Sequence, residues 1–384
     1  MRSLKILWSK WEKRIKHPVY LVSLAVVILI MLAGHNYYRQ EAKRVKERVF
    51  NEISSVAQLK AQQIRDWLDN RKADAEVLSK SKFFAPNLIA VIQKPDPMAV
   101  TRIRERLELM AENYKYSRIL IIDDRKNVVL SYGAEAPSQL SPDLIQAIEL
   151  AAKQRQVINT DLHQHEENGP VHLDVVAPFW DPDDPEKIVQ AFIVLTADAE
   201  LFLFPVIQRW PYLSDTAETL LVKRLGEEVV FLNELKHKKD TALNFRLPLS
   251  QKELPAVQAA LGHYGRYEGI DYRGKPVLAF LTSVPNTCWA VVSKMDRQEA
   301  TAGFQKRSFL LILFLISLIV ANLLITELFW QRRQKVNFQK MYEAEARARE
   351  TQQLFQVLSD SAMAGVYLVQ DGVFKYVNRS LAEM

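Results

Sequence analysis

The sequence predicts an α+β protein in which two successive mixed modules lie between two membrane-spanning helices. Three observations lead to this prediction. Two apolar stretches without charge stand far apart, near residues 19–38 and 309–325. A segment with helical periodicity and without Pro or Gly follows the first stretch. The sequence between the stretches then repeats one order of elements, a hairpin, a helix and further strands, which is typical of mostly antiparallel sheets that carry helices.

The composition excludes several classes of protein. The 384 residues carry a net charge of +6 and a single cysteine, Cys288, which excludes an internal disulfide. Neither G-x-x-x-x-G-K-[ST] nor G-x-G-x-x-G occurs. We therefore expect neither a P-loop ATPase, nor a Rossmann enzyme, nor a Cys-rich zinc module. Because Cys288 precedes Trp289 in an apolar strand, we expect its thiol to be buried and inert.

Two segments are long enough to cross a bilayer. Residues 18–38 and 308–330 each supply about twenty mostly apolar residues, which cover ~30 Å of hydrocarbon at ~1.5 Å per residue. Residues 1–17 form a basic tail with six Lys or Arg and one Glu, and Arg332, Arg333, Lys335 and Lys340 follow the second segment. Basic flanks favour the cytoplasmic side. We therefore expect a protein of the inner membrane with the lipid bilayer as a partner, cytoplasmic termini, and residues 39–307 outside.

Two alternatives stay open at these segments. The first segment could be a cleaved signal peptide, although its basic region is long and Leu-Ala-Gly-His is a weak cleavage site. Glu327 is either a functional intramembrane acid or an interfacial residue that reaches the headgroups. The basic residues belong to the membrane flanks, so they do not indicate nucleic-acid binding.

Between the two spans we expect a long helix over residues 39–84, followed by two modules. The first module, residues 85–210, opens with short strands and turns. It contains a hairpin at 118–132, a helix at 142–154 and strands at 157–161, 171–179 and 189–197. The second module, residues 211–307, contains a hairpin at 217–232, a helix at 252–261 and strands at 264–269, 275–284 and 288–294.

This organisation resembles the double-Cache sensor region of bacterial transmembrane receptors. The resemblance covers residues 37–307 and includes segments such as TDLHQHEENGPVHLDVVAPFWD and GIDYRGKPVLAFLTSVPNTCWAVVSKMD. It implies two tandem PAS-like (Cache) modules on the long N-terminal helix, a homodimer formed along that helix, and a small-molecule pocket in the membrane-distal module. The arginine–tryptophan–tyrosine–aspartate pattern of the amino-acid-binding branch is not evident, because Arg209-Trp210-Pro211-Tyr212 lies at the link between the modules.

After the second span we expect a helical linker over residues 331–358 and a segment that resembles the opening of a PAS domain over residues 359–384. Asp371-Gly372 is a tight-turn signal between two short strands, and Asn378 is a natural cap for a helix that begins at Arg379. We expect the chain to stop before the rest of this domain and its output domain. The cofactor of the PAS-like part stays open.

Six residues are candidates for contact with a ligand. They are Tyr116, Arg118, His172, Asp174, Trp180 and Asp198. His172 and Asp174 alternate onto one face of an expected strand, and the others stand at the beginnings or ends of expected strands. An aromatic wall with a few fixed polar groups is typical of a small-molecule pocket. The mixture suits a small polar or cationic solute. The alternative is that the polar candidates face solvent and that Trp180 belongs to the core.

No metal site and no cofactor is expected in these 384 residues. Residues 163–167 (HQHEE) contain metal-ligand types, but Asn-Gly-Pro follows them, which favours a solvated loop. The acidic turn at residues 181–185 (DPDDP) lacks the spacing and the glycine of an EF-hand loop.

The function that we expect is that of a signal receptor without its own active site. No histidine follows His263, so no phosphoacceptor histidine stands on a cytoplasmic helix. We expect the receptor to sense an extracytoplasmic small molecule and to relay it through the second span to a PAS and output module. The enzyme that it drives is expected to be a histidine kinase, with a diguanylate cyclase as the second choice. The alternative is a membrane-anchored solute-binding or scaffold protein without signalling output.

Overall fold

The computed structural model describes residues 2–82, 84–93, 96–133, 137, 139–164, 169–181, 183–186 and 188–383. The chain divides into two compact units. One unit contains residues 1–41 and 306–384, and the other contains residues 42–305.

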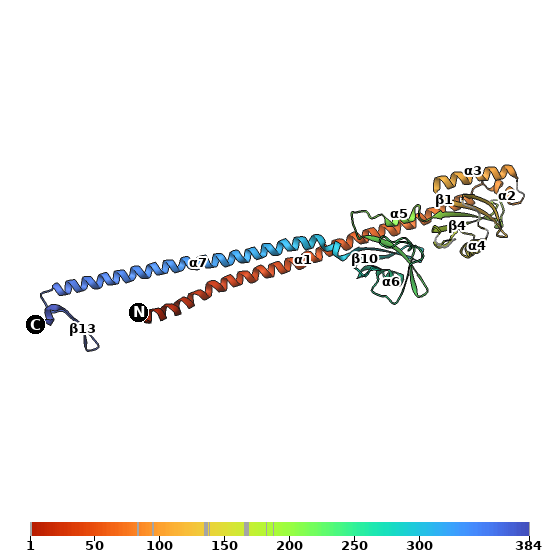
Figure 1. The fold of residues 1–384 in the computed structure, drawn as a ribbon. Helices are drawn as coiled ribbons and strands as arrows, with labels where there is room; N and C mark the ends of the chain where they lie inside the picture. Colours follow the sequence, from red (N-terminus) through yellow and green to blue (C-terminus); the bar gives the residue numbers. More distant parts are fainter. Residues whose placement is uncertain are drawn as a thin grey trace. The chain divides into compact units, whose positions relative to one another are not determined.

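Within the described residues, two helices are long and apolar enough to cross a membrane. Helix α1 (Arg2–Ser79) is continuous, so the expected first span and the expected outer helix are parts of one element (Figure 1). Helix α7 (Arg297–Ser361) likewise joins the second apolar stretch to the expected linker. The absence of Pro and Gly between His35 and Phe84 explains why α1 is not interrupted there, since these residues weaken helix interiors most.

The larger unit begins with a five-stranded antiparallel sheet, the first sheet. Its strands are, in spatial order, β2 (Val128–Gly133), β1 (Tyr116–Asp123), β5 (Ala191–Asp198), β4 (His172–Phe179) and β3 (Ile158–Asn159). The helices against it are α1, α2 (Ala85–Gln93), α3 (Pro97–Tyr114) and α4 (Pro142–Gln154). Figure 1 shows α3 along one face and α4 on the other. Strand periodicity explains this division, because Val175 and Ala177 pack in the cluster with α1 while Val176 packs against α4.

A six-stranded antiparallel sheet, the second sheet, follows in the same unit. Its strands are, in spatial order, β8 (Arg246–Pro248), β7 (Glu228–Phe231), β6 (Glu218–Leu225), β11 (Trp289–Asp296), β10 (Pro276–Ser283) and β9 (Gly265–Ile270). Helix α6 (Pro255–Ala260) covers one face, and apolar residues of α1 pack on the other. The short helix α5 (Leu203–Gln208) connects the two sheets. Apart from β8, the spatial order of the strands is the same in both sheets.

Two expectations about local structure are wrong. Residues 85–93 and 97–114 form α2 and α3 instead of short strands and turns. Asp96 caps α3 by accepting hydrogen bonds from the backbone N–H groups of Met98 and Ala99 at 3.4 and 3.1 Å. Cys288 is exposed and not buried, since it precedes the first residue of β11 and only Trp289 enters the core.

The smaller unit contains polar contacts between its two long helices. Ser23 Oγ donates a hydrogen bond to Asn322 Oδ1 at 2.5 Å, and Tyr20 OH donates one to Glu327 Oε2 at 3.2 Å. Hydrogen bonds of this kind hold helices together where hydrocarbon surrounds them. Glu327 therefore has a defined partner on α1, which neither of its two expected roles anticipated.

A small hairpin and a helix end the described chain. They are β12 (Tyr367–Gln370), β13 (Val373–Val377) and α8 (Arg379–Ala382). The side chain of Asn378 is fully buried, and its oxygen accepts from the N–H groups of Val366 and Leu381 at 2.8 and 3.2 Å. Its amide donates to the carbonyl oxygen of Ser359 at 2.7 Å. Asn378 thus caps α8, as predicted, and also fastens the hairpin to the end of α7.

Candidate ligand-binding site

Polar side chains gather on one face of the first sheet, at one end of its three central strands. Arg118 of β1 is directly opposite Thr196 of β5, and Thr196 is directly opposite Asp174 of β4. His172 and Asp198 form the next pair along β4 and β5. Two positions further into the sheet, the same face is apolar and packs against α4. The face therefore combines an apolar wall with a polar end, as small-molecule sites do.

Asp174 is the centre of this polar cluster. Its side chain is 0% exposed, Oδ1 accepts a hydrogen bond from Thr196 Oγ1 at 2.6 Å, and Oδ2 lies 3.3 Å from His163 Nε2. Its backbone N–H donates to Thr160 Oγ1 at 2.9 Å. A carboxylate removed from water is retained only where hydrogen bonds or charges compensate it. The surrounding side chains supply that compensation.

Two histidines flank the carboxylate and differ in their ionisation. His163 and His172 form an isolated antiparallel bridge, in which their backbones exchange hydrogen bonds of 3.0 and 2.8 Å. Burial lowers the pKa of His163, but the hydrogen bond and the charge of Asp174 outweigh it, so the pKa is raised. Burial dominates at His172 and lowers its pKa in spite of Asp174 and Asp198. The surroundings thus favour protonation of His163 and disfavour protonation of His172.

The structure brings four of the six predicted residues together. Arg118, His172, Asp174 and Asp198 lie on this face at this end of the sheet, whereas Tyr116 lies on the opposite face and Trp180 beyond the other end of β4. Tyr116 is on the α1 side, where its hydroxyl donates to Asp74 Oδ2 at 2.6 Å. Whether any of the six contacts a ligand stays a prediction.

Trp180 lies in a separate hollow of about 450 Å³, beyond the opposite end of β4. Three basic residues, Lys72, Lys80 and Arg155, line this hollow with it. Arg155 follows the last residue of α4 and Lys80 follows that of α1. Cations at these two positions complement the negative ends of two helices, and Lys80 also pairs with Glu76, so neither of these two cations requires a ligand.

Three residues of this cluster were not among the ligand-site candidates from the sequence, namely Thr160, His163 and Thr196. Thr196 could have been found, since it precedes Asp198 by two residues and shares its face of β5. His163 was considered as a metal-ligand type within an expected solvated loop, but its side chain is buried. Residues 165–167 of the HQHEE segment and Pro182 of the acidic turn lie outside the described residues. Within the described ranges, no group of three or more His, Cys, Asp or Glu is placed to hold a metal ion.

A groove of about 490 Å³ meets the cluster at Asp198. It lies between α1, the end of α3 and the chain after β5. Trp67, Arg71, Lys115 and Phe202 are among its lining residues. Asp198 is half-buried and belongs both to the polar end of the sheet and to this groove. The groove is large enough for a small molecule, but it adjoins the face of the sheet that α1 and α3 cover and meets the polar cluster at Asp198.

The architecture around this site is similar in fold to solved sensor domains of bacterial chemoreceptors. No family model and no curated protein matches the sequence. Among solved structures, the sensory domain of the Campylobacter jejuni chemoreceptor Tlp3 has a TM-score of 0.51 at 9% sequence identity and covers 67% of this chain and 98% of that domain. The Tlp3 domain in complex with L-norvaline has the same TM-score and identity, with coverages of 67% and 94%.

A domain of Pseudomonas aeruginosa PAO1 is less similar in structure. It is the ligand-binding domain of the amino acid chemoreceptor PctB in complex with L-Arg, with a TM-score of 0.46, 12% identity, and coverages of 67% and 98%. The likeness to Tlp3 establishes the fold. The expectation of a Cache-type sensor region in this chain is therefore confirmed at the level of the fold.

Proposed function

We propose that this chain is the input part of a transmembrane receptor that binds a small polar molecule on the first sheet. In this proposal α1 and α7 cross the membrane, residues 39–307 form two tandem Cache modules outside it, and the PAS-like segment lies in the cytoplasm. Two copies associate along α1. The polar end of the first sheet carries the proposal, because a cluster of buried ionisable groups beside a groove is costly for a merely structural sheet.

The chemistry of the cluster suits a small zwitterion. Arg118 can bind a carboxylate through two parallel hydrogen bonds, and the acids Asp174 and Asp198 can accept from an ammonium group. The apolar wall beside them, which includes Val176 and Val194, would hold a short aliphatic portion. An α-amino acid has these three features. The Tlp3 domain, which has this fold, is described in complex with L-norvaline.

The relay depends on α7, which begins immediately after the last strand of the second sheet. This helix has no proline and no glycine after Gly303, and it leads to the hairpin that Asn378 fastens. A ligand shifts an equilibrium between two arrangements only by binding one of them better. A single rigid helix is a suitable element for such a two-state change.

The binding proposal can be tested with the full chain in lipid nanodiscs and a panel of L-amino acids. At a concentration of 100 times Kd, a bound amino acid should stabilise the chain by about 2.7 kcal/mol, and this appears as a rise in melting temperature. Asp174→Asn should abolish that rise. Asp183→Asn changes an exposed acid of the same module and should leave it intact.

Two results would contradict the proposal. One is a panel in which no amino acid and no related zwitterion changes the melting temperature of the wild-type chain. The other is an Asp174→Asn variant that melts as a folded protein and keeps the full rise. Asn can still accept from Thr196, which makes folding of this variant the expected result.

A further inference from the structure

One carboxylate, Asp161, fastens the first sheet to the second. It follows β3 by two residues, and its Oδ1 accepts a hydrogen bond from Trp289 Nε1 at 2.8 Å. Its Oδ2 accepts from Lys223 Nζ at 2.6 Å. Lys223 and Trp289 are directly opposite each other on β6 and β11. Asp161 therefore holds a cross-strand pair of the second sheet, with one oxygen on each partner.

The same residue contacts the candidate ligand site through its backbone. The carbonyl oxygen of Asp161 accepts a hydrogen bond from His163 Nδ1 at 3.0 Å. The other ring nitrogen of His163 lies 3.3 Å from Asp174 Oδ2. A continuous set of polar contacts thus leads from the buried carboxylate in the first sheet to two central strands of the second sheet.

The contact differs from an ordinary surface ion pair because its donors are largely buried. Lys223 is 14% exposed and the indole of Trp289 is buried, whereas the Asp161 side chain keeps 37% exposure. Exposed ion pairs contribute about 0–1 kcal/mol because water and salt screen them. Hydrogen bonds to an ionised group from partly buried donors are shorter and stronger. This contact can therefore hold one geometry between the two sheets.

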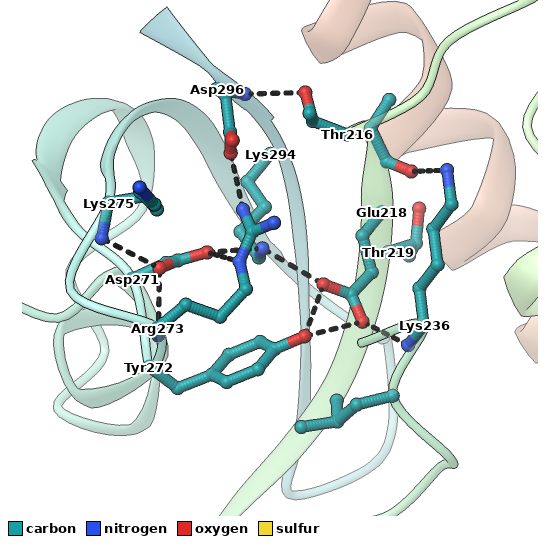
Figure 2. Close-up of polar contacts among 12 residues, drawn as sticks. Thr216, Glu218, Thr219, Lys236, Asp271, Tyr272, Arg273, Lys275, Lys294 and Asp296 are labelled. Atoms are coloured by element: carbon teal, nitrogen blue, oxygen red, sulfur yellow. Dashed lines mark hydrogen bonds and ion pairs between the residues drawn. The ribbon is translucent and has the colours of Figure 1, made fainter. Parts of the chain in front are cut away.

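The far end of β11 is fixed by a second set of charges, which Figure 2 shows. Lys294 is 0% exposed and its Nζ lies 2.9 Å from Glu218 Oε2 and 2.8 Å from Asp271 Oδ2. Asp296, the last residue of β11, pairs with Arg273, and its N–H donates to Thr216 Oγ1 at 3.1 Å. These contacts anchor the strand at the point where the chain leaves the sheet.

The first turn of α7 is anchored to the same region. Glu299 accepts hydrogen bonds from Ser214 Oγ at 2.7 Å and from the N–H of Thr216 at 2.9 Å. These contacts lower the pKa of Glu299 although burial opposes them, so the acid stays ionised. Strand β11 is thus held by Asp161 at its beginning and continues into an anchored helix at its end.

We propose that Asp161 is a positioning residue that couples the candidate ligand site to β11 and so to the start of α7. A change at His163 or Asp174 moves Asp161, and Asp161 moves the Lys223–Trp289 pair. The inference rests on the proposed function in one respect, because it takes the first sheet as the place where the signal originates. It needs two arrangements of the sheets that differ in this contact, because contiguity alone does not establish coupling.

A double-mutant cycle without any ligand tests the coupling. The full chain in nanodiscs is compared as wild type, His163→Gln, Asp161→Asn and the double variant, by hydrogen exchange of the amides of β11. His163→Gln should lower their protection about tenfold in the wild-type background, as expected for loss of a charge-assisted contact. In the Asp161→Asn background it should lower the protection less than twofold, since the connection is already broken.

A spectroscopic signal distinguishes a positioning role of Asp161 from a general loss of stability. When the chain is labelled with 5-fluorotryptophan, the fluorine resonance of Trp289 can be assigned by comparison with Trp289→Phe. This resonance should shift in His163→Gln. It should not shift further when Asp161→Asn is added. Lys223→Gln is the second variant if Asp161→Asn fails to fold, because it keeps the carboxylate and removes one partner. Asp183→Asn is the surface control.

Equal effects of His163→Gln in both backgrounds would overturn the proposal, as would unchanged protection of β11. Because no ligand is present, either result would leave the binding proposal standing. If the chain binds no zwitterion but the double-mutant cycle shows the expected coupling, the binding proposal fails and the coupling proposal stands.

Discussion

At the scale of single residues, the surroundings of Cys288 report on the contact between the sheets. Exclusion of water by the neighbouring protein raises the pKa of the Cys288 thiol, and the negative charge of Asp161 raises it further. Lys223 acts in the opposite direction and lowers it. The thiolate is the reactive form of cysteine, so the rate of alkylation follows these two charges.

Two substitutions should therefore change alkylation in opposite directions. Asp161→Asn removes the charge that disfavours the thiolate, so iodoacetamide should react faster with Cys288 at pH 7.5. Lys223→Gln removes the charge that favours the thiolate, so the reaction should be slower. The chain has one cysteine, and the uptake of label reports this position alone. Rates that change in the same direction in both variants would contradict the placement of the two charges.

The two histidines of the candidate site should affect stability in opposite pH ranges. The folded-state pKa of His163 is raised, so its favourable contribution is complete below the ordinary value of about 6.5 and is lost as the pH rises through the raised value. The pKa of His172 is lowered by burial, so its contribution is lost as the pH falls below about 6.5.

Thermal denaturation of the full chain at pH 5 to pH 8 can measure this difference. His163→Gln should lower the melting temperature more at pH 5 than at pH 8, because only the protonated ring is stabilised by Asp174. His172→Gln, the matched control on the neighbouring strand, should show the opposite trend. A constant difference between wild type and His163→Gln across this range would be inconsistent with a charged pair.

The residues of the site differ in how far their positions follow from local sequence. Arg118, His172, Asp174 and Asp198 stand at alternate positions in strands, so their common face follows from the twofold period of a strand. Tyr116 faces α1 because the register shifts between Tyr116 and Arg118, and a bulge of this kind has no simple sequence signal. Local alternation could not reveal this reversal.

At the scale of elements, the sequence patterns indicated the hairpins of both modules and helices α4 and α6, but not α2, α3 and α5. The signal was present, since Asp96-Pro97 is a helix start and Ile103, Leu107 and Met110 recur at helical spacing. Strand β8 has three residues and depends on β7 for its conformation, so no local pattern indicates it. Short edge elements are fixed by tertiary pairing.

The ionic contacts at the end of β11 permit a sharp test of element stability. Lys294→Met leaves the carboxylates of Glu218 and Asp271 buried without their common cation. Removing one partner of a buried ion pair typically costs about 3–5 kcal/mol, because the remaining charge is desolvated and uncompensated. The measurement is the free energy for exchange of the most protected amides of the second sheet.

The control is Lys275→Met on the neighbouring turn. The Lys275 side chain is exposed, and its backbone N–H, which the substitution keeps, donates to Asp271 Oδ1 at 3.1 Å. This variant should change the free energy by less than about 0.5 kcal/mol, as surface substitutions usually do. Equal losses in both variants would mean that the charges around Lys294 are not the anchor of β11.

At the scale of the whole molecule, the repeated order of elements in the sequence corresponds to a repeated sheet. Strands β2, β1, β5, β4 and β3 occur in the same spatial order as β7, β6, β11, β10 and β9. Neighbouring strands in a sheet are often consecutive in sequence, which makes such an order predictable. The side-chain bridge through Asp161 was not predictable, because Asp161 is 62 and 128 residues from its two partners.

The direction of the chain in the membrane is the last expectation, and it follows from charge. The basic residues before the first apolar stretch and those after the second both belong to short flanks, where Lys and Arg keep a segment in the cytoplasm. Two crossings then require that both sheets lie outside.

Alkaline phosphatase fused in the exposed turn at Gly226 should be active, and the same enzyme fused after Gln339 should be inactive. Fluorescent protein fusions at these positions should give the reverse result. Replacing Arg332, Arg333 and Lys335 by Gln should weaken the difference, because the charge bias sets the orientation. Phosphatase activity at Gln339 with none at Gly226 would place the candidate site in the cytoplasm, where an extracytoplasmic ligand could not reach Asp174.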